Sequence, residues 1–222
     1  MKNKKLIIYG IGSFAEYVQY LFDKDSQYEV VGFCVERTIF DQTSISLYNK
    51  PLIPFEDIMK VFPPESYYLF IAVGNNIIRK RIFNLAKELG YKLAKFISTK
   101  TICWEDLSYG ENTFIDEGCK IHPYVEIGDN SIIMFSSIGH HTKIGSHNLI
   151  SVSTLGGRVT VKNESFIGMN SVIKQNVTIA SKNIIGMGCV IEGDTQENSV
   201  YSNKGTTKRN TTYDKVANRF LK

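Results

Sequence analysis

The stretch "SFIGMNSVIKQNVTIASKNIIGMGCVI", residues 165–191, carries an isoleucine at every sixth position. These positions are Ile167, Ile173, Ile179, Ile185 and Ile191. A six-residue period is typical of a parallel β-helix, in which each turn has three short flat sides and each side points one aliphatic residue inward. The stretch therefore predicts a stack of β-helix coils.

The same register extends through most of the second half of the chain. Further aliphatic positions six residues apart are Ile115, Ile121, Ile127, Ile133, then Ile138, Ile144, Ile150, then Val161. Two steps that are one residue short join these blocks, one after Ile133 and one after Ile150. Three hexapeptides make one coil, and coils stack about 4.8 Å apart. Residues three hexapeptides apart in the sequence should therefore lie above one another. Where a short step intervenes, this separation is one residue less.

The first half of the chain alternates strand and helix patterns instead. Short apolar runs predict buried strands at 5–10, 29–35, 67–74 and 92–97. Helical spacing of apolar residues appears at 13–22 and 75–90. In the second of these helices the expected apolar stripe is Ile78, Ile82, Leu85, Ala86 and Leu89. Strands that alternate with helices predict an α/β unit with a small, Rossmann-like parallel sheet.

The chain therefore divides into three parts. We expect a Rossmann-like, nucleotide-sugar-binding α/β domain at 1–98, a parallel β-helix domain at 99–200, and a basic C-terminal tail at 201–222. The tail carries six Lys or Arg residues against one Asp. Such a tail is usually solvated and sometimes holds an anion.

Composition narrows the class of protein. Apolar residues make up 43% of the chain and charged residues 22%, a balance ordinary for a water-soluble protein. A net charge of +4 is too small to argue for a nucleic-acid partner. The four cysteines lack CxxC spacing, which favours reduced thiols in a cytoplasmic protein. The N-terminal apolar run is too short for a signal peptide, and no stretch is long enough to span a membrane.

The quoted repeat, together with "YGIGSFAEYV", "AVGNNIIRKRI" and "IGHHTKIGSHNLIS", resembles the hexapeptide-repeat acyltransferases with a left-handed β-helix. The resemblance is to the branch with an N-terminal α/β domain, the bacillosamine- and sialic-acid-type sugar acetyltransferases. It implies a homotrimer, acetyl-coenzyme A bound between neighbouring β-helices, and a nucleotide-linked sugar held partly by the N-terminal domain. It also implies a role in surface-glycan synthesis such as lipopolysaccharide biosynthesis.

The glycine-rich turn "GIGSFA" is the first candidate site. Gly10, Gly12 and Ser13 open a predicted helix, and Glu36 follows further along the chain, after the next predicted strand. The pattern is typical of dinucleotide binding, where glycines let phosphate approach a helix N-terminus. The predicted domain is too short for both halves of an NAD-binding fold. The resemblance implies instead that this turn, Glu36 with Arg37, and Gly74 with Asn75 contact a nucleotide-sugar, although a purely structural turn is also compatible with the pattern.

The second candidate site is the histidine pair. The resemblance places the catalytic base at His140, and histidine titrates in the range that suits this task. One coil above His140, with the short step taken into account, lies Gly157. Its backbone N–H is the predicted donor to the thioester oxyanion, and the pair Gly156–Gly157 lets a ligand approach the backbone closely. His141 stands where related enzymes carry an acidic residue, so either histidine remains a candidate base.

Three further positions, His122, His147 and Leu149, lie near the histidine pair in the repeat. Counting one full coil back from His140 reaches His122, which we expect beneath the site. We expect His147 to be an exposed or intersubunit polar residue. Leu149 replaces a second histidine that bacillosamine-type enzymes carry near the acetyl group.

A zinc site of the γ-carbonic-anhydrase type is a rival interpretation of the histidines. Zinc ligands must converge on one point at about 2.1 Å. Adjacent residues of a strand point to opposite faces, so His140 and His141 should not share a metal. We therefore expect no metal.

The basic tail departs from the family pattern, because it lacks the usual loop with proline beside coenzyme A. Lys208 and Arg209, with Lys204, are candidates to contact the phosphates of the coenzyme. A solvated tail fits the same residues.

Together these features predict an acetyl-coenzyme A-dependent N-acetyltransferase acting on a nucleotide-linked amino sugar. O-acetylation of a sugar hydroxyl uses the same residues and stays open. A non-catalytic nucleotide-sugar-binding protein is a third interpretation.

Overall fold

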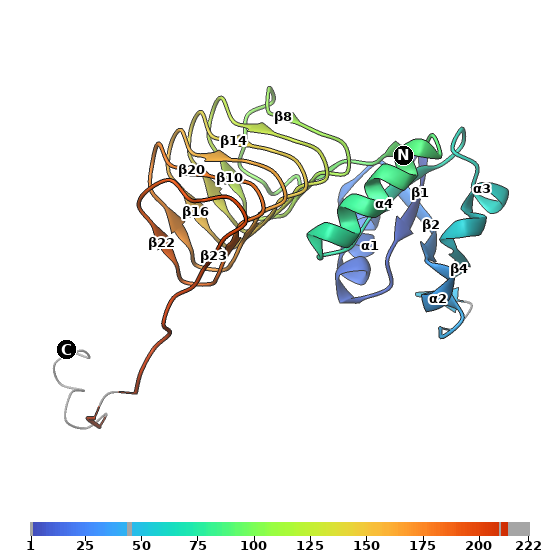
Figure 1. Ribbon diagram of the computed structural model, residues 1–222. Helices are drawn as coiled ribbons and strands as arrows, with labels where there is room; N and C mark the ends of the chain where they lie inside the picture. Colours follow the sequence, from blue (N-terminus) through green and yellow to red (C-terminus); the bar gives the residue numbers. More distant parts are fainter. Residues whose placement is uncertain (1, 44–45, 209, 213–222) are drawn as a thin grey trace.

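The computed structural model describes residues 2–43, 46–208 and 210–212. Figure 1 shows an α/β domain on one side and a stack of coils on the other. The elements of the α/β domain are β1 (Lys4–Tyr9), α1 (Ser13–Asp25), β2 (Tyr28–Val35), α2 (Arg37–Phe40), β3 (Ser46–Leu47), β4 (Lys50–Pro54), a 3₁₀ turn (Phe55–Asp57), α3 (Ile58–Val61), β5 (Tyr68–Ile71), α4 (Asn76–Glu88) and β6 (Lys92–Leu93).

These strands form one sheet in the order β3-β4-β2-β1-β5-β6. Every pair is parallel except the short β3–β4 pair. The chain moves from β1 to β2 on one side and later returns to β5 on the other side of β1. Ligands of such open sheets bind at this switch point, beyond the carboxyl ends of the two central strands. The prediction of a small Rossmann-like parallel sheet is therefore confirmed.

Strand β1 shows why the sheet is covered on both faces. Leu6 and Ile8 point into one apolar cluster, which contains the buried side of α1. Ile7 and Tyr9 point into another, which contains the buried residues of α3 and α4. A continuous apolar run is what a parallel strand buried on both faces requires.

The coils form a parallel β-helix with three flat sheets, left-handed as the resemblance implies. Sheet I contains β7 (Phe96–Ile97), β9 (Phe114–Ile115), β12 (Ile132–Met134), β15 (Leu149–Ser151), β18 (Phe166–Ile167), β21 (Ile184–Ile185) and β23 (Val200–Tyr201). Sheet II contains β10 (Lys120–Ile121), β13 (Ser137–Ile138), β16 (Thr154–Leu155), β19 (Val172–Ile173) and β22 (Val190–Ile191). Sheet III contains β8 (Ser108–Tyr109), β11 (Glu126–Ile127), β14 (Lys143–Ile144), β17 (Thr160–Val161) and β20 (Thr178–Ile179).

The isoleucines at the sixth positions fill the interior of the β-helix, as predicted. They form one buried cluster from Ile115 to Ile191. Leu149 pairs with Phe166 across a coil that contains a short step, and Phe166 pairs with Ile184 across a coil of full length. The short steps in the sequence therefore produce the shortened coils that they predict.

The α/β domain packs on the outer face of sheet I. Phe114 of β9 points outward and joins the apolar cluster of α1, where its ring stacks on Phe96 at 5.0 Å between centroids. Strand β7 already pairs with β9, so chain segments on either side of residue 98 are continuous with the β-helix. The division after residue 98 stays a prediction.

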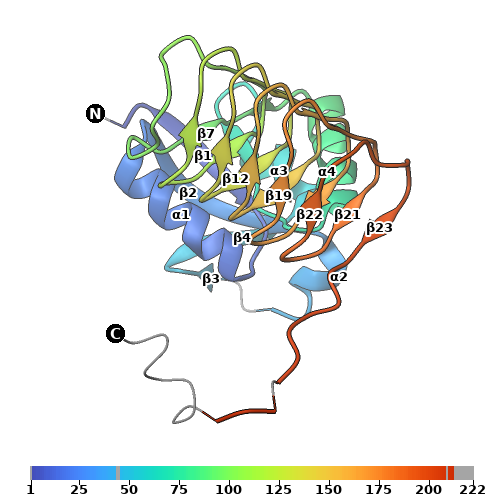
Figure 2. The same ribbon diagram turned by 90° about the vertical axis from the view of Figure 1, so that its left-hand side faces the viewer.

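After β23 the described chain leaves the stack, as the red segment in Figure 2 shows. Residues 202–208 are exposed. None of the described helices is both long and apolar enough to cross a membrane.

Candidate functional site

His140 lies in the turn that leads from β13 in sheet II to β14 in sheet III, and it is exposed. The pairing of Ile138 with Leu155 sets the register of this turn against the coil above. Two residues further along, the register places Gly157 over His140. The backbone N–H of Arg158 also donates to the carbonyl of His140 at 2.8 Å. The predicted stacking of Gly157 on His140 is thus present in the fold.

The imidazole of His140 occupies space that only a glycine at position 157 leaves open. A Cβ built on Gly157 would lie 2.7 Å from His140 Nε2, closer than real Cβ contacts come. Within the described part of the chain, no backbone hydrogen bond uses the N–H of Gly157. The turn therefore combines a free imidazole nitrogen with a neighbouring backbone donor that is available to a ligand.

The two adjacent histidines contact each other. His140 Nδ1 lies 3.0 Å from His141 Nδ1, and the rings meet edge to face. His141 has a φ of +59°, a left-handed conformation that reverses the direction of the turn. The expectation that the two side chains point to opposite faces was wrong, because they lie in this turn and not in a strand.

The other side of His141 faces an aromatic ring. Tyr124 lies 4.6 Å from His141 between ring centroids. The N–H of His141 donates to the carbonyl of Pro123, one coil below.

The expectation that His122 lies beneath His140 was off by one residue. The coil between them contains the short step after Ile133, so Pro123 occupies that place.

The predicted nucleotide-sugar residues gather at the switch point of the α/β sheet. Gly10 follows β1 and has a φ of +127°, and a Cβ there would lie 2.7 Å from the carbonyl oxygen of Ala72 after β5. Gly12 precedes α1, faces open space, and leaves room at the helix N-terminus. The N–H groups of Gly12 and Ser13 make no backbone hydrogen bond within the described part of the chain. These amides are suited to an anion such as a phosphate.

Glu36 and Arg37 sit at the end of β2, but each is held by an ion pair. Both oxygens of Glu36 accept from the Arg81 guanidinium, at 2.7 and 2.9 Å. This hydrogen-bonded guanidinium lowers the pKa of Glu36, against the opposing effect of its partial burial. Arg37 pairs with Asp57 instead. Glu36 therefore reaches the switch point, whereas Arg37 turns to the rim of the domain.

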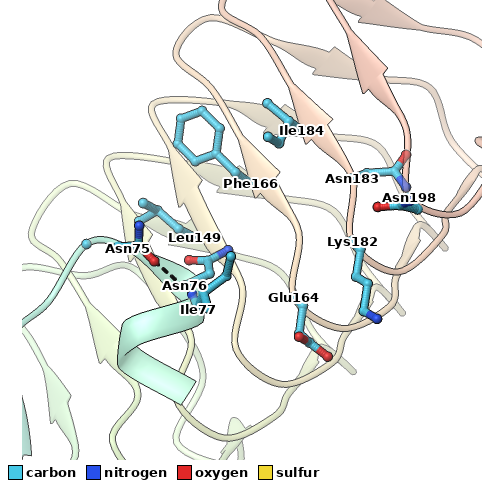
Figure 3. Close-up of a pocket in the computed structure, with 11 residues that line it drawn as sticks. Asn75, Asn76, Ile77, Leu149, Glu164, Phe166, Lys182, Asn183, Ile184 and Asn198 are labelled. Carbon is cyan, nitrogen blue, oxygen red and sulfur yellow. Dashed lines mark hydrogen bonds between the residues drawn. The ribbon is translucent and has the colours of Figure 1, made fainter. Parts of the chain in front are cut away.

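The loop between β5 and α4 forms one wall of a cleft of about 780 Å³ (Figure 3). Asn75 caps α4, because its Oδ1 accepts from the N–H groups of Ile77 and Ile78. The opposite wall is the outer face of sheet I. In Figure 3 the side chains that line the cleft include Leu149, Phe166, Ile184, Glu164 and Lys182. Gly74 and Asn75, predicted to bind substrate, thus line this cleft.

Sequence reasoning missed Arg79, which lies immediately behind this loop. Of the expected apolar stripe of α4, Ile82 and Ala86 are buried as predicted, whereas Ile78 and Leu85 are exposed. The buried face consists of Arg79, Ile82, Phe83 and Ala86. A signal existed, because position 79 lies three residues before Ile82 on the same helical face. A charged side chain does not fit the apolar pattern of a buried helix face, so the pattern does not predict that Arg79 is buried.

His147 is half-buried at the junction of the two domains, so the expectation of an exposed residue was wrong, and an intersubunit position stays a prediction. Its Nδ1 lies 2.8 Å from Asn130 Nδ2, and its ring packs edge-on against Phe83 of α4. An amide nitrogen only donates, so Nδ1 accepts and the neutral ring carries its proton on Nε2. Burial, followed by the nearby Lys80 and Arg79 charges, lowers the pKa of His147.

The two predicted centres are separate within one chain. His140 lies at the corner between sheets II and III, whereas the cleft with Gly74 and Asn75 lies on sheet I. Lys208 is exposed in the segment that leaves the stack, and Arg209 lies outside the described residues. The structure therefore brings Gly156–Gly157 to His140 but does not bring the described part of the tail to them.

Within the described chain no group of three or more His, Cys, Asp or Glu side chains is arranged to hold a metal ion. All four cysteines are free thiols in the structure.

Comparison with known proteins adds two findings. Residues 5–86 match the family described as the PglD N-terminal domain. Most of the chain is similar in fold to solved acetyltransferase structures. The acetyltransferase domain of PglB from Neisseria gonorrhoeae has a TM-score of 0.79 at 24% identity, over 89% of this chain and 96% of that chain.

Two further structures show the same fold. A perosamine N-acetyltransferase variant from Caulobacter crescentus, in complex with CoA and GDP-perosamine, has a TM-score of 0.78 at 21% identity, over 88% of this chain and 92% of that one. WeeI from Acinetobacter baumannii has a TM-score of 0.76 at 20% identity, over 91% of this chain and 98% of that one. The predicted resemblance is confirmed: an N-terminal α/β domain is joined to the β-helix as in these proteins.

Proposed function

We propose that this protein is an acetyl-coenzyme A-dependent N-acetyltransferase acting on a nucleotide-linked amino sugar of a cytoplasmic surface-glycan pathway, such as lipopolysaccharide biosynthesis. The observation that carries the proposal is the contact between His140 and Gly157. An imidazole nitrogen and a backbone donor at one point are what acyl transfer from a thioester requires. The proposal is consistent with the CoA-bound and acetyl-coenzyme A-bound structures of similar fold.

His141 determines which nitrogen of His140 acts as the base. One of the two facing Nδ1 atoms must carry the proton of their hydrogen bond. With the proton on His140 Nδ1, that nitrogen donates a hydrogen bond to Nδ1 of His141, and Nε2 of His140 carries a free lone pair beside Gly157. His141 then orients the base through a lone pair, in the place where an acidic residue would do so through a charge. His140 is the base in this assignment and His141 its partner.

Acetyl transfer then follows in one site. The acceptor amine attacks the thioester carbonyl carbon and His140 Nε2 takes a proton from that amine. The N–H of Gly157 faces the oxyanion of the tetrahedral intermediate. As the carbon–sulfur bond breaks, His140 returns the proton to the coenzyme A sulfur. Gly156 and Gly157 leave room for the thioester to lie against the backbone.

A second chain would bring the acceptor to His140. Exposed apolar residues gather at the turns between sheets I and II and on the adjoining face of sheet II, namely Phe135, Val152, Met169, Met187, Val172 and Val190. We define these six as the apolar edge. A three-fold axis along this edge places sheet II of one chain against sheet I of the next. His140 of one chain then faces the Gly74–Asn75 cleft of its neighbour, in a homotrimer with three shared sites.

The nucleotide part of the acceptor fits the switch point of the α/β domain. Gly10, Gly12 and Ser13 leave the start of α1 open for a diphosphate, and Glu36 lies at the end of β2. The amino sugar then extends along Gly74 and Asn75 into the cleft. Lys208 and Arg209 of the C-terminal tail remain our candidates for contact with the phosphates of coenzyme A.

Two variants test the proposed chemistry. His140→Ala should lower kcat by about 10²- to 10⁴-fold, the usual contribution of a general base, without weakening acetyl-coenzyme A binding. Gly157→Ala should lower kcat by at least about 10²-fold, because its Cβ displaces the imidazole and disturbs the oxyanion donor. Steady-state kinetics and calorimetric binding of acetyl-coenzyme A measure both.

His122→Ala is the matched control, since it removes a histidine one coil away that is out of register with His140. It should keep nearly full activity. Near-normal turnover by folded His140→Ala protein would refute the assignment of the base.

The choice between N- and O-acetylation depends on the acceptor. A panel of nucleotide amino sugars and their hydroxyl counterparts, assayed with acetyl-coenzyme A, should give products only with the amines. Transfer to the hydroxyl compounds alone would replace the proposal by a sugar O-acetyltransferase.

A further inference from the structure

Arg79 is a fully buried charge whose hydrogen bonds all reach main-chain carbonyls or a neutral amide. Its Nη1 donates to the carbonyls of Val73 and Gly74, both at 2.9 Å. Its Nη2 donates to Asn76 Oδ1 at 2.8 Å. These three contacts hold the loop that forms one wall of the cleft.

The same side chain holds the β-helix. Arg79 Nε donates to the carbonyl of Asn130 at 3.2 Å, and Nη2 donates to the carbonyl of Asn148 at 3.0 Å. These carbonyls belong to successive coils at the corner between sheets III and I. All five N–H donors of the guanidinium are therefore used, two toward the β-helix and three toward the loop. Asn76 adds a parallel link, since its Nδ2 donates to the carbonyl of Ser165 at 3.0 Å.

This position is unfavourable for a positive charge on general grounds. Arg79 is in the first turn of α4, where the helix dipole repels cations. It is completely inaccessible to solvent, and none of its hydrogen-bond partners is a carboxylate. An apolar residue would satisfy the helical pattern better. Residues that break a local rule in this way tend to mark functional sites.

We infer that Arg79 is a positioning residue, which holds the Val73–Asn76 loop at a set distance from sheet I and so shapes the cleft for the acceptor. The inference rests on the proposed function, in which this loop contacts the nucleotide-linked sugar. Arg79 does not itself line the cleft, so it acts through the loop. The carbonyls of Val73 and Gly74 are turned back onto the guanidinium, which keeps them away from the ligand side.

The fork of the guanidinium matters more than its charge. A lysine at this position keeps the charge but offers three donors from one point, and it cannot reach two carbonyls on each side. Arg79→Lys should therefore loosen the loop while leaving the β-helix and His140 intact. Arg79→Gln removes the charge as well and gives a second variant.

Steady-state kinetics with separate titrations of the two substrates test the inference. Arg79→Lys should raise KM for the nucleotide amino sugar by about tenfold or more, with KM for acetyl-coenzyme A and kcat within about twofold of wild type. Arg79→Gln should show the same split, more strongly. Lys87→Gln is the matched control, because Lys87 also links α4 to the first β-helix coils, through Glu111, but touches no carbonyl of the loop. It should leave both KM values unchanged.

Two results would overturn the inference. One is an unchanged KM for the sugar in folded Arg79→Lys protein, even if its melting temperature falls, since that marks a purely structural residue. The other is an equal rise of both KM values.

Amide hydrogen exchange separates this inference from the proposed function. If the wild-type protein acetylates no nucleotide amino sugar, the proposed function fails. Arg79→Lys should still speed exchange in residues 72–78 while exchange in the β-helix is unchanged. Unaltered exchange in the loop would refute the positioning role independently of any activity.

Discussion

His140 and His141 meet because the backbone reverses between them. In a strand their side chains would diverge, but the left-handed φ of His141 brings both Nδ1 atoms within hydrogen-bond distance. The contact is the basis of the role that we propose for His141, to accept a hydrogen bond from Nδ1 of His140. The position of Gly157 was predictable from register alone, whereas this contact required the turn geometry.

His147 supplies a prediction about pH and stability. Burial lowers the pKa of its ring in the folded protein, while the unfolded chain keeps an ordinary value near 6.5. Below pH about 6.5 the unfolded state therefore binds more protons than the native state, and stability falls as the pH decreases through this window. Above it, the contribution of His147 is fully present.

His147→Gln should flatten this dependence, because glutamine can still accept from Asn130 but does not titrate. Denaturant unfolding between pH 5 and pH 8, taken as approximate limits around that pKa, measures the effect. His122→Gln serves as the control. Equal slopes for the wild type and His147→Gln would contradict the burial effect.

The hexapeptide coil is the element that organises the second half of the molecule. Each short strand contributes one aliphatic side chain to a core that runs from Ile115 to Ile191. Within the β-helix each coil contacts only the coils above and below it, so the stability of the stack depends on a few buried side chains per coil. The α/β domain differs, because its central strands are covered by helices on both faces.

Truncation of one interior isoleucine should show how strongly the stack depends on its core. Ile167→Ala removes a side chain with no exposed surface and should lower the free energy of unfolding by about 2–5 kcal/mol. Val200→Ala truncates an aliphatic residue that is 70% exposed and should change it by less than about 0.5 kcal/mol. Denaturant titration measures both. A loss below about 1 kcal/mol for Ile167→Ala would mean that the coils do not rely on interior packing.

At the scale of the whole molecule, the proposed acceptor site and the proposed base lie on different sides of the β-helix. A complete site therefore combines the acceptor site of one chain with His140 of a second chain. The apolar edge offers a surface for such an assembly, since six large apolar side chains are exposed along one side of the coils.

Complementation between two inactive variants tests the shared site. His140→Ala lacks the base, and Gly12→Asp places a carboxylate where we expect phosphate. The second change should not disturb folding, because a Cβ on Gly12 meets nothing within 4 Å and Asp is a good N-cap. Co-expression at equal levels should recover activity at about a quarter of all sites, by random assortment around a three-fold ring. All of the recovered sites lie in mixed trimers, with one complete site in each.

Each variant alone should be nearly inactive. Light scattering should give the mass of three chains of 25.1 kDa, and Met187→Asp in the apolar edge should lower it. Val61→Asp, at an exposed site on α3, should not. Absence of any recovered activity in confirmed mixed trimers would place both halves of the site in one chain.

The two architectures and the position of Gly157 relative to His140 were predictable from the amino-acid pattern alone. They were predictable because the period of an inward-facing residue follows from coil geometry, and register along a stack is counted residue by residue. The same register is sensitive to the position of each short step. The short step after Ile133 places Pro123 beneath His140, where we expected His122.

The way in which the two domains meet follows from contacts between residues far apart in the chain. Arg79 binds the carbonyls of Asn130 and Asn148, far away in the sequence, and His147 packs on Phe83 of α4. Backbone carbonyls are present at every position, so no residue type or spacing marks the ones that a distant side chain will reach. The α/β half of the candidate site depends on these contacts, whereas the histidine half depends on a local repeat.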